Sequence, residues 1–190
     1  MRKVSPMEKR IADVTAELTR IANDANERFG ELSEQQLNWK PSAKGWSIAQ
    51  CLDHVIVTHK LYFPLLGRLA DGSHKPSFQE RFSPLSGLWG RMLLYLVSPE
   101  TERKVKTAPM AEPSQSEIDQ IVERFAEHQA EMIEHLRRLP STIDPHKTII
   151  TSPLMAIVTY SLDNTFTIFT THSQRHLDQA VRVTEHDGFP

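Results

Sequence analysis

The sequence contains two histidines four residues apart, His172 and His176, whose spacing suits a metal site. On an α-helix such residues lie one above the other, about 6 Å apart along the axis and about 40° apart around it, so both imidazoles can bind one ion. On a β-strand they would lie about 13 Å apart and could not share an ion. A metal site at this pair therefore requires a helix around it.

The spacing alone is a weak signal, because nine histidines in 190 residues give roughly 0.4 such pairs per chain by chance. The alternative is a pair of partly exposed helix histidines that bind nothing. Two observations favour the metal. The pair continues an apolar stripe that includes Phe169, so at least one imidazole should face inward. A buried imidazole needs a polar partner, which a metal ion would supply.

The residues around the pair exclude two classes of metalloprotein. Zinc proteases with the H-E-x-x-H pattern carry a glutamate general base directly after the first histidine, where this chain has Ser173. Ferritin-like di-iron bundles need Glu-x-x-His on two helices, and the sequence contains no Glu-x-x-His. The site would therefore hold one ion and needs a third ligand.

Spacing does not select that third ligand. His54 and His59 fall on one predicted helix, about 140° apart, so they cannot both face one site. His128 and His135 border the apolar stripe of another helix. For each of the four considered alone, a solvated or hydrogen-bonded histidine is the simpler interpretation.

The spacing of apolar residues predicts the helices that must position these side chains. The first covers residues 6–29 and the third covers residues 116–139. The second begins at Ser47, which can cap it, and Pro64 should kink it or end its regular part.

The last helix, predicted over residues 160–183, is the hardest to assign. Residues 165–171 are β-branched and aromatic, and propensity alone favours a strand there. Apolar residues nevertheless keep helical spacing across the whole segment, and we follow that periodicity.

Residues 71–113 differ from the rest of the chain, because they contain five of the twelve prolines and three glycines. Such a stretch cannot be one regular element. Within it, residues 88–97 are apolar enough to form a short buried helix. We interpret the whole stretch as an insertion that lies over the bundle.

The composition indicates one globular domain, residues 1–190. The net charge of −2, with both signs spread along the chain, argues against a nucleic-acid or anionic-membrane surface. No apolar run is long enough to span a membrane, and the N-terminus lacks the apolar run of a signal peptide, so a cytoplasmic location is expected. The single cysteine, Cys51, excludes an intrachain disulfide and a Cys-rich zinc site. We expect it in the core.

Two motifs are informative when they are taken together. Residues 37–41, Leu-Asn-Trp-Lys-Pro, followed by Gly-Trp-Ser-Ile-Ala-Gln-Cys-Leu-Asp-His at 45–54, resemble the second-helix signature of the DinB-like superfamily. There, a histidine eight positions after the tryptophan is a ligand. Residues 172–179, His-Ser-Gln-Arg-His-Leu-Asp-Gln, resemble its last-helix motif. The joint occurrence, in the expected order, is far more specific than either motif alone.

This resemblance implies an all-α fold, a four-helix bundle that is commonly a homodimer. It also implies three histidine ligands for nickel, zinc or another divalent ion, which are His54, His172 and His176 in this sequence. Known activities in the family include S-transfer with small thiols such as bacillithiol and mycothiol, and isomerisation of maleylpyruvate. The stretch 71–113 is longer than the family pattern.

We therefore expect a metal-dependent enzyme acting on a small molecule, a small-thiol S-transferase in the first place and a hydrolase as an alternative. Three neutral imidazoles leave the ion an open position, where water or a thiol can become a nucleophile at neutral pH. Two other interpretations stay open. One is a non-catalytic, metal-stabilised binding or stress-response module with His128 as a fourth ligand, and the other is a bundle whose histidines bind nothing.

Three further residues lie near the expected ligands in the sequence. Gln179, one turn beyond His176, could hydrogen-bond a ligand or substrate, or could be solvated. Arg175 lies about 100° from the histidine pair and is expected to be a surface charge. Trp46 is expected to be a packing anchor where the second helix begins.

Overall fold

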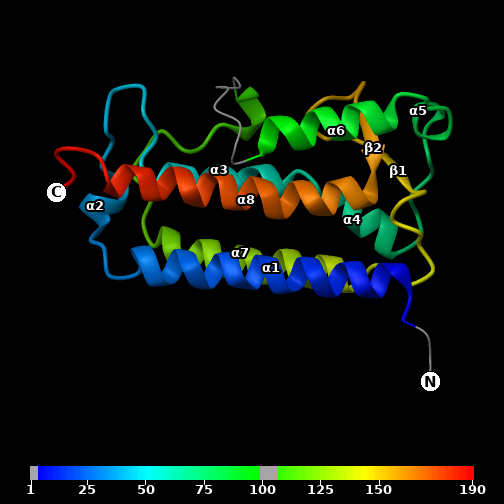
Figure 1. Cartoon of the computed structure of the whole chain (residues 1–190), viewed down its shortest axis with the longest axis horizontal. Coiled ribbons are helices and arrows are strands. Elements are labelled where there is room, and N and C mark those ends of the chain that lie inside the picture. The colour runs from blue at the N-terminus through cyan, green and yellow to red at the C-terminus, as the bar shows by residue number, and fades with distance from the viewer. Residues whose placement is uncertain (1–3, 99–106) are drawn as a thin grey trace.

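The computed structural model describes residues 4–98 and 107–190. Long helices lie side by side in it and form a bundle (Figure 1). They are α1 (Pro6–Phe29), α3 (Ile48–Lys60) with its continuation α4 (Phe63–Ala70), α7 (Ile121–Arg137) and α8 (Leu162–Thr184). Both α1 and α3 pack against α7 and against α8. The predicted all-α four-helix bundle is confirmed.

Shorter elements join and cover these helices. They are α2 (Glu34–Asn38), α5 (Phe78–Arg81), α6 (Ser86–Val97), the 3-10 turn η1 (Pro109–Ala111), and the strands β1 (Ile149–Thr151) and β2 (Thr159–Ser161). The strands form an antiparallel pair with Ile150 opposite Tyr160. Helix α6 packs on α8 and β2, and Gly90 permits this close approach, because a Cβ there would meet the side chain of Asn164.

Local sequence signals explain where the bundle helices begin and break. The Oγ of Ser5 accepts a hydrogen bond from the backbone N–H of Glu8, whose carboxylate accepts one from the N–H of Ser5. This capping box begins α1, as predicted. The break between α3 and α4 places Pro64 in the first turn of α4, where its missing N–H removes no hydrogen bond.

The predicted third and fourth helices need corrections at their ends. The third begins at Ile121 rather than 116, because Gln120 has a left-handed backbone (φ 53°). Ile118 extended the predicted helix because it is apolar and continues the helical spacing. It is buried, but it lies in the preceding loop. The fourth begins at Leu162, after β2. The strand alternative for residues 165–171 is wrong, because the side chains at helical spacing in that segment are the buried ones.

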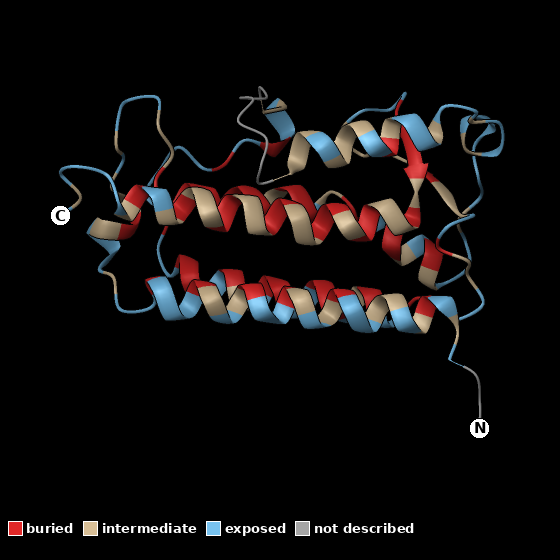
Figure 2. Cartoon of the chain, viewed as in Figure 1, coloured by how far each residue is buried: buried red, intermediate tan, exposed pale blue. Residues whose placement is uncertain are grey.

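The helix predicted within residues 88–97 forms, as α6, but it is not a buried helix. Gly90 is its only buried residue, whereas Leu88 and Tyr95 are more than half exposed. The reason is that α6 lies on the outside of α8 and has one covered face (Figure 2). The insertion itself stays a prediction, and residues 99–106 of that stretch lie outside the described residues.

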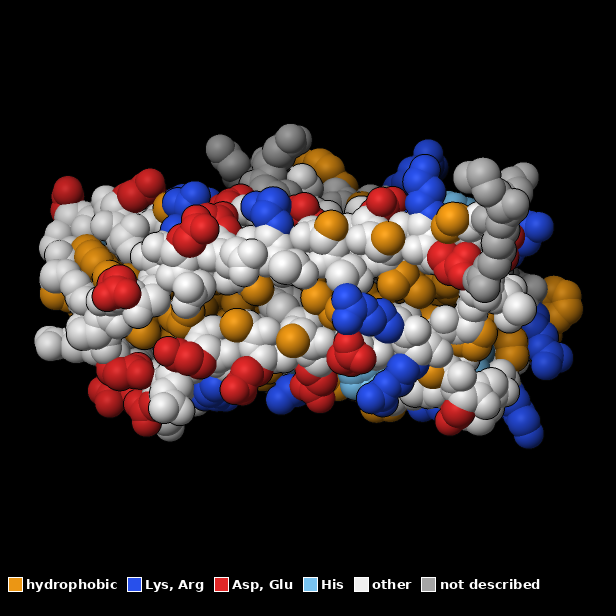
Figure 3. Space-filling view, turned by 90° about the horizontal axis from the view of Figure 1, so that it is seen from below, with side chains coloured by type: hydrophobic (Ala, Val, Ile, Leu, Met, Phe, Trp, Pro, Cys, Tyr) orange, Lys and Arg blue, Asp and Glu red, His pale blue; other side chains and the backbone are white. Residues whose placement is uncertain are grey.

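The surface agrees with the charge pattern of the sequence. Acidic and basic side chains are interspersed on the face seen from below, where α1 and α7 lie (Figure 3). In the parts of the chain that the structure describes, no helix has the length and apolar character to cross a membrane.

Candidate metal centre

The structure brings together the three histidines that the family resemblance implied. His54 lies on α3, and His172 and His176 lie on α8. One ring nitrogen of each lies within 4.8 Å of the other two, and the Nε2 atoms of His54 and His172 are 3.2 Å apart. Each of the three keeps only between 6% and 8% of its surface exposed, so the cluster is buried.

The backbone places this cluster through two capped helices that pack side by side. Ser47 and Gln50 form a capping box that begins α3, and His54 follows two turns later on the buried side. Ser161 caps α8 by accepting a hydrogen bond from the N–H of Asn164. The helix therefore includes residues 165–171, for which residue propensity alone favours a strand. The four-residue spacing then puts both α8 imidazoles on the face toward α3.

Burial keeps the three imidazoles neutral. It is the largest cause that lowers the pKa of His54, and it lowers the pKa values of His172 and His176 well below the ordinary range. Repulsion among the three rings lowers the pKa of His172 and His176 further. Neutral imidazoles have the lone pairs that a metal ion needs.

The arrangement of ring nitrogens fits a metal ion. The Nδ1–H of His54 donates to the backbone oxygen of Ala111 at 2.6 Å, which leaves the Nε2 lone pair directed into the cluster. The Nδ1 atoms of His172 and His176 are buried without a partner among the described residues. No Asp, Glu or Cys of the described chain joins the group, so the donor set is three imidazoles, which suits zinc or nickel.

Trp46 and Gln179 contact the candidate ligands. The ring of Trp46 lies 4.9 Å from that of His54 and 5.6 Å from that of His176, so this packing residue forms a wall of the site. The side chain of Gln179 raises the pKa of His176 against the larger effect of burial. This influence favours the interpretation in which Gln179 acts on a ligand over the one in which it is only solvated.

Arg175 is not the surface charge that the helix geometry predicted. Its Nη1 donates to the backbone oxygens of Leu96 at 2.9 Å and Ser98 at 2.8 Å, at the end of α6. The prediction treated α8 as a helix facing solvent on that side, whereas α6 covers it. Arg175 therefore fastens the ligand-bearing helix to α6.

The other candidate histidines lie outside the cluster. His59 and His128 are both buried, and their rings pack on each other with centroids 5.5 Å apart. His128 also stacks on Phe63, as does His135. Because His128 does not join the three-histidine group, the structure gives no support to a site closed by His128 as a fourth ligand.

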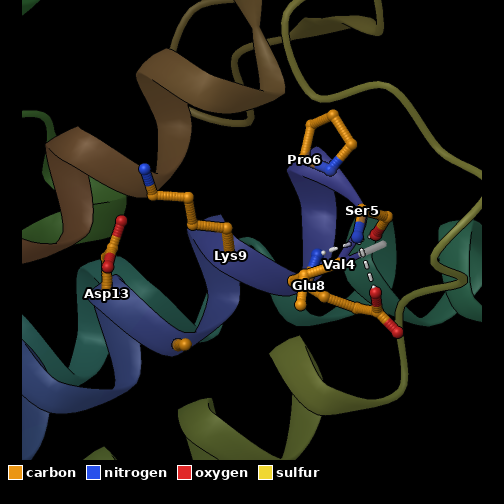
Figure 4. A pocket seen from close by; sticks show the side chains of 7 residues that line it. Val4, Ser5, Pro6, Glu8, Lys9 and Asp13 are labelled. Atoms are coloured by element: carbon orange, nitrogen blue, oxygen red, sulfur yellow. Dashed lines mark hydrogen bonds between the residues drawn. The ribbon is translucent and has the colours of Figure 1, made fainter. Parts of the chain in front are cut away.

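Cys51 and an open recess at the start of α1 are not part of the histidine cluster. Cys51 is fully buried in the core, as expected, and burial raises the pKa of its thiol. An open recess at the start of α1 is lined by exposed side chains such as Lys9 and Asp13 and contains none of the three histidines (Figure 4).

The backbone carbonyl of Ala111, which accepts a hydrogen bond from His54, could not be predicted from the sequence, because a backbone group has no signature in residue type.

Comparison with known proteins places this architecture in a family. Residues 17–180 match the DinB superfamily. No curated protein matches the chain. Among solved structures, the chain is similar to YfiT from Bacillus subtilis, described as a probable metal-dependent hydrolase with an unusual four-helix bundle topology. The two are 13% identical, with a TM-score of 0.55 over 99% of this chain and 92% of the other. The chain belongs to the DinB superfamily.

Proposed function

We propose that this protein is a metal-dependent enzyme that acts on a small molecule, with His54, His172 and His176 as the ligands of one divalent ion. The observation that carries the proposal is the convergence of three buried, neutral imidazoles whose ring nitrogens lie within 4.8 Å of one another. Such an ion supplies Lewis acidity and lowers the pKa of a water or thiol in its open position, so that a nucleophile is available at neutral pH.

Small-thiol S-transfer is the leading reaction, in which the thiol loses its proton to solvent and its sulfur bonds to an electrophilic carbon as the bond from that carbon to the leaving group breaks. Among the described residues, no carboxylate joins the three imidazoles, so the group offers no carboxylate general base to activate water. This favours a nucleophile that ionises without such a base. A thiol, with a pKa of about 8.5, needs far less help to ionise than water, with a pKa of about 15.7. Trp46 covers one side of the imidazoles of His54 and His176.

Hydrolysis is the second candidate, favoured by the description of YfiT as a probable metal-dependent hydrolase. The chain would then use the same three ligands with water in place of the thiol. Dimerisation and a cytoplasmic location stay predictions.

The first test is the metal content of protein purified without a histidine tag, measured by mass spectrometry. We expect about one divalent ion per chain in the wild type and almost none in His54→Ala or His176→Ala, because two imidazoles bind a divalent ion much more weakly than three. The matched control is His146→Ala, which removes an exposed histidine outside the cluster and should keep the ion. A wild type that stays metal-free after incubation with zinc and nickel would overturn the proposal.

The second test separates the two reactions in the metal-loaded protein. Conjugation that requires an added small thiol would support S-transfer. Turnover of ester or amide substrates without thiol would support hydrolysis. Bound metal with neither activity would instead favour the non-catalytic binding or stress-response module.

A further inference from the structure

The orientation of His54 depends on a segment that belongs to neither ligand-bearing helix. The backbone oxygen that accepts from its Nδ1–H is that of Ala111, in η1, just before the connection to α7. The bond is 2.6 Å long and buried. Since a neutral imidazole has one N–H, this carbonyl decides which ring nitrogen keeps the lone pair.

Two side chains of α3 hold the segment that carries this carbonyl. The Nε2 of Gln50 donates to the backbone oxygen of Ser114 at 2.8 Å, and the Oδ2 of Asp53 accepts from the backbone N–H of Ser114 at 2.9 Å. The backbone C=O and N–H of Ser114 are thus both hydrogen-bonded to side chains of α3. Gln50 and Asp53 are only 3% and 5% exposed, so little water competes with these bonds.

The three side chains involved share one face of α3, because Gln50, Asp53 and His54 are spaced at i, i+3 and i+4. The helix face that presents the ligand therefore also anchors the loop that orients the ligand. A buried carboxylate is costly to keep unless it is hydrogen-bonded and paired. The Ser114 N–H and the guanidinium of Arg124, 3.8 Å from Oδ1, are the partners of Asp53.

We propose that Asp53, assisted by Gln50, is a positioning residue for the metal centre. By fixing the segment from Ala111 to Ser114, it holds the carbonyl that keeps His54 in the Nδ1–H form with Nε2 facing the ion. This inference rests on the metal site of the proposed function. Hydrogen-bond partners of this kind typically change metal affinity by about ten- to a hundredfold when they are removed.

The test compares Asp53→Ala with Asp53→Asn. We expect Asp53→Ala to lower zinc affinity about ten- to a hundredfold in competition with a chromophoric chelator, and to alter the visible spectrum of the cobalt-substituted protein. Asp53→Asn keeps an oxygen that can accept from the Ser114 N–H, and it should recover most of the affinity. Circular dichroism checks that both variants keep their helices.

The matched control is Asn38→Ala. The side chain of Asn38 holds the same connection further along, donating to the oxygen of Ile118 at 3.1 Å and accepting from its N–H at 2.9 Å. Its removal should lower stability but leave zinc affinity and the cobalt spectrum unchanged. Equal loss of affinity in Asn38→Ala and Asp53→Ala, or wild-type affinity in Asp53→Ala, would overturn the positioning role.

A second readout needs no metal, so the two proposals can fail separately. Nitrogen-15 spectra of the histidine rings in metal-free protein report the tautomer of each imidazole. We expect His54 to be in the Nδ1–H form in the wild type and in Asn38→Ala, and in a mixture of tautomers in Asp53→Ala. A fixed Nδ1–H form in all three would overturn the inference, whereas absence of metal binding with the expected spectra would overturn the proposed function alone.

Discussion

Replacing His128 by phenylalanine should make the metal-free protein markedly more resistant to acid. The pKa of His128 is lowered to about 3, chiefly by burial and to a smaller extent by the charges of Lys60 and His135. In the unfolded chain the same side chain titrates near its ordinary pKa of about 6.5. Glu131, 4.0 Å from Nδ1, is half exposed, so water screens its opposing effect.

The direction in which stability changes with pH follows from the number of protons bound by the unfolded and the folded chain. As the pH falls below about 6.5, the unfolded chain gains a proton at His128 that the folded chain does not bind until about pH 3. Stability is therefore lost through this window, by about 1.4 kcal/mol per pH unit and on the order of 5 kcal/mol in total. Phenylalanine has no such group, so the variant should keep that stability.

The measurement is urea unfolding at pH 8, 6 and 5 with a chelator present. Phenylalanine suits the position because the imidazole already stacks on Phe63, and neither of its ring nitrogens has a partner among the described residues. We expect the variant to match the wild type at pH 8 and to exceed it increasingly below pH 6.5. As a control, His146→Ala, which removes an exposed histidine, should lose stability with falling pH as the wild type does. If His128→Phe also followed the wild type, burial would not be keeping the His128 imidazole neutral. Burial also lowers the pKa values of His59 and of the three clustered histidines. These four residues remain in both proteins and retain part of the acid sensitivity.

The bundle could be predicted because its helices depend on local signals. The capping box at Ser5 and the apolar spacing across α8 each reflect forces that act within one helix or between that helix and a core. The predictions that failed concern how helices cover one another. Arg175 and the outer face of α6 were misjudged because the position of α6 on α8 depends on tertiary packing, including the close contact at Gly90.

The same distinction applies to the site. Helical spacing brought His172 and His176 together, but the residues alone left four candidates for the third position. The structure resolves this through the direction of each side chain around α3. The Nε2 of His54 lies 3.2 Å from that of His172, whereas the ring of His59 packs against Phe169 and His128 and does not join the group of ligands. Only the family resemblance contained that tertiary information in advance.

Phe169→Ala should be the most damaging single substitution of the core that supports the site. Phe169 is fully buried on α8, one turn before His172, and its ring contacts those of His59 and Tyr62 with centroids 5.0 Å and 4.9 Å away. Truncation of a buried phenylalanine costs about 3–5 kcal/mol, through lost burial and the cavity left behind. For a chain of this size that corresponds to a fall in Tm of roughly 6–20 °C.

The effect should extend to metal binding, because the ring of His59 contacts that of Phe169 and lies 6.2 Å from that of His172. A cavity at Phe169 lets His59 move and removes support from His172, so we expect weaker zinc binding as well as a lower Tm. Phe78→Ala is the control, since its side chain is 77% exposed and should change stability by less than about 1 kcal/mol. An equal fall in Tm in the two variants would contradict the packing argument. A Phe169→Ala variant with a lower Tm but full zinc affinity would mean that His172 is held by its own helix rather than by the surrounding core.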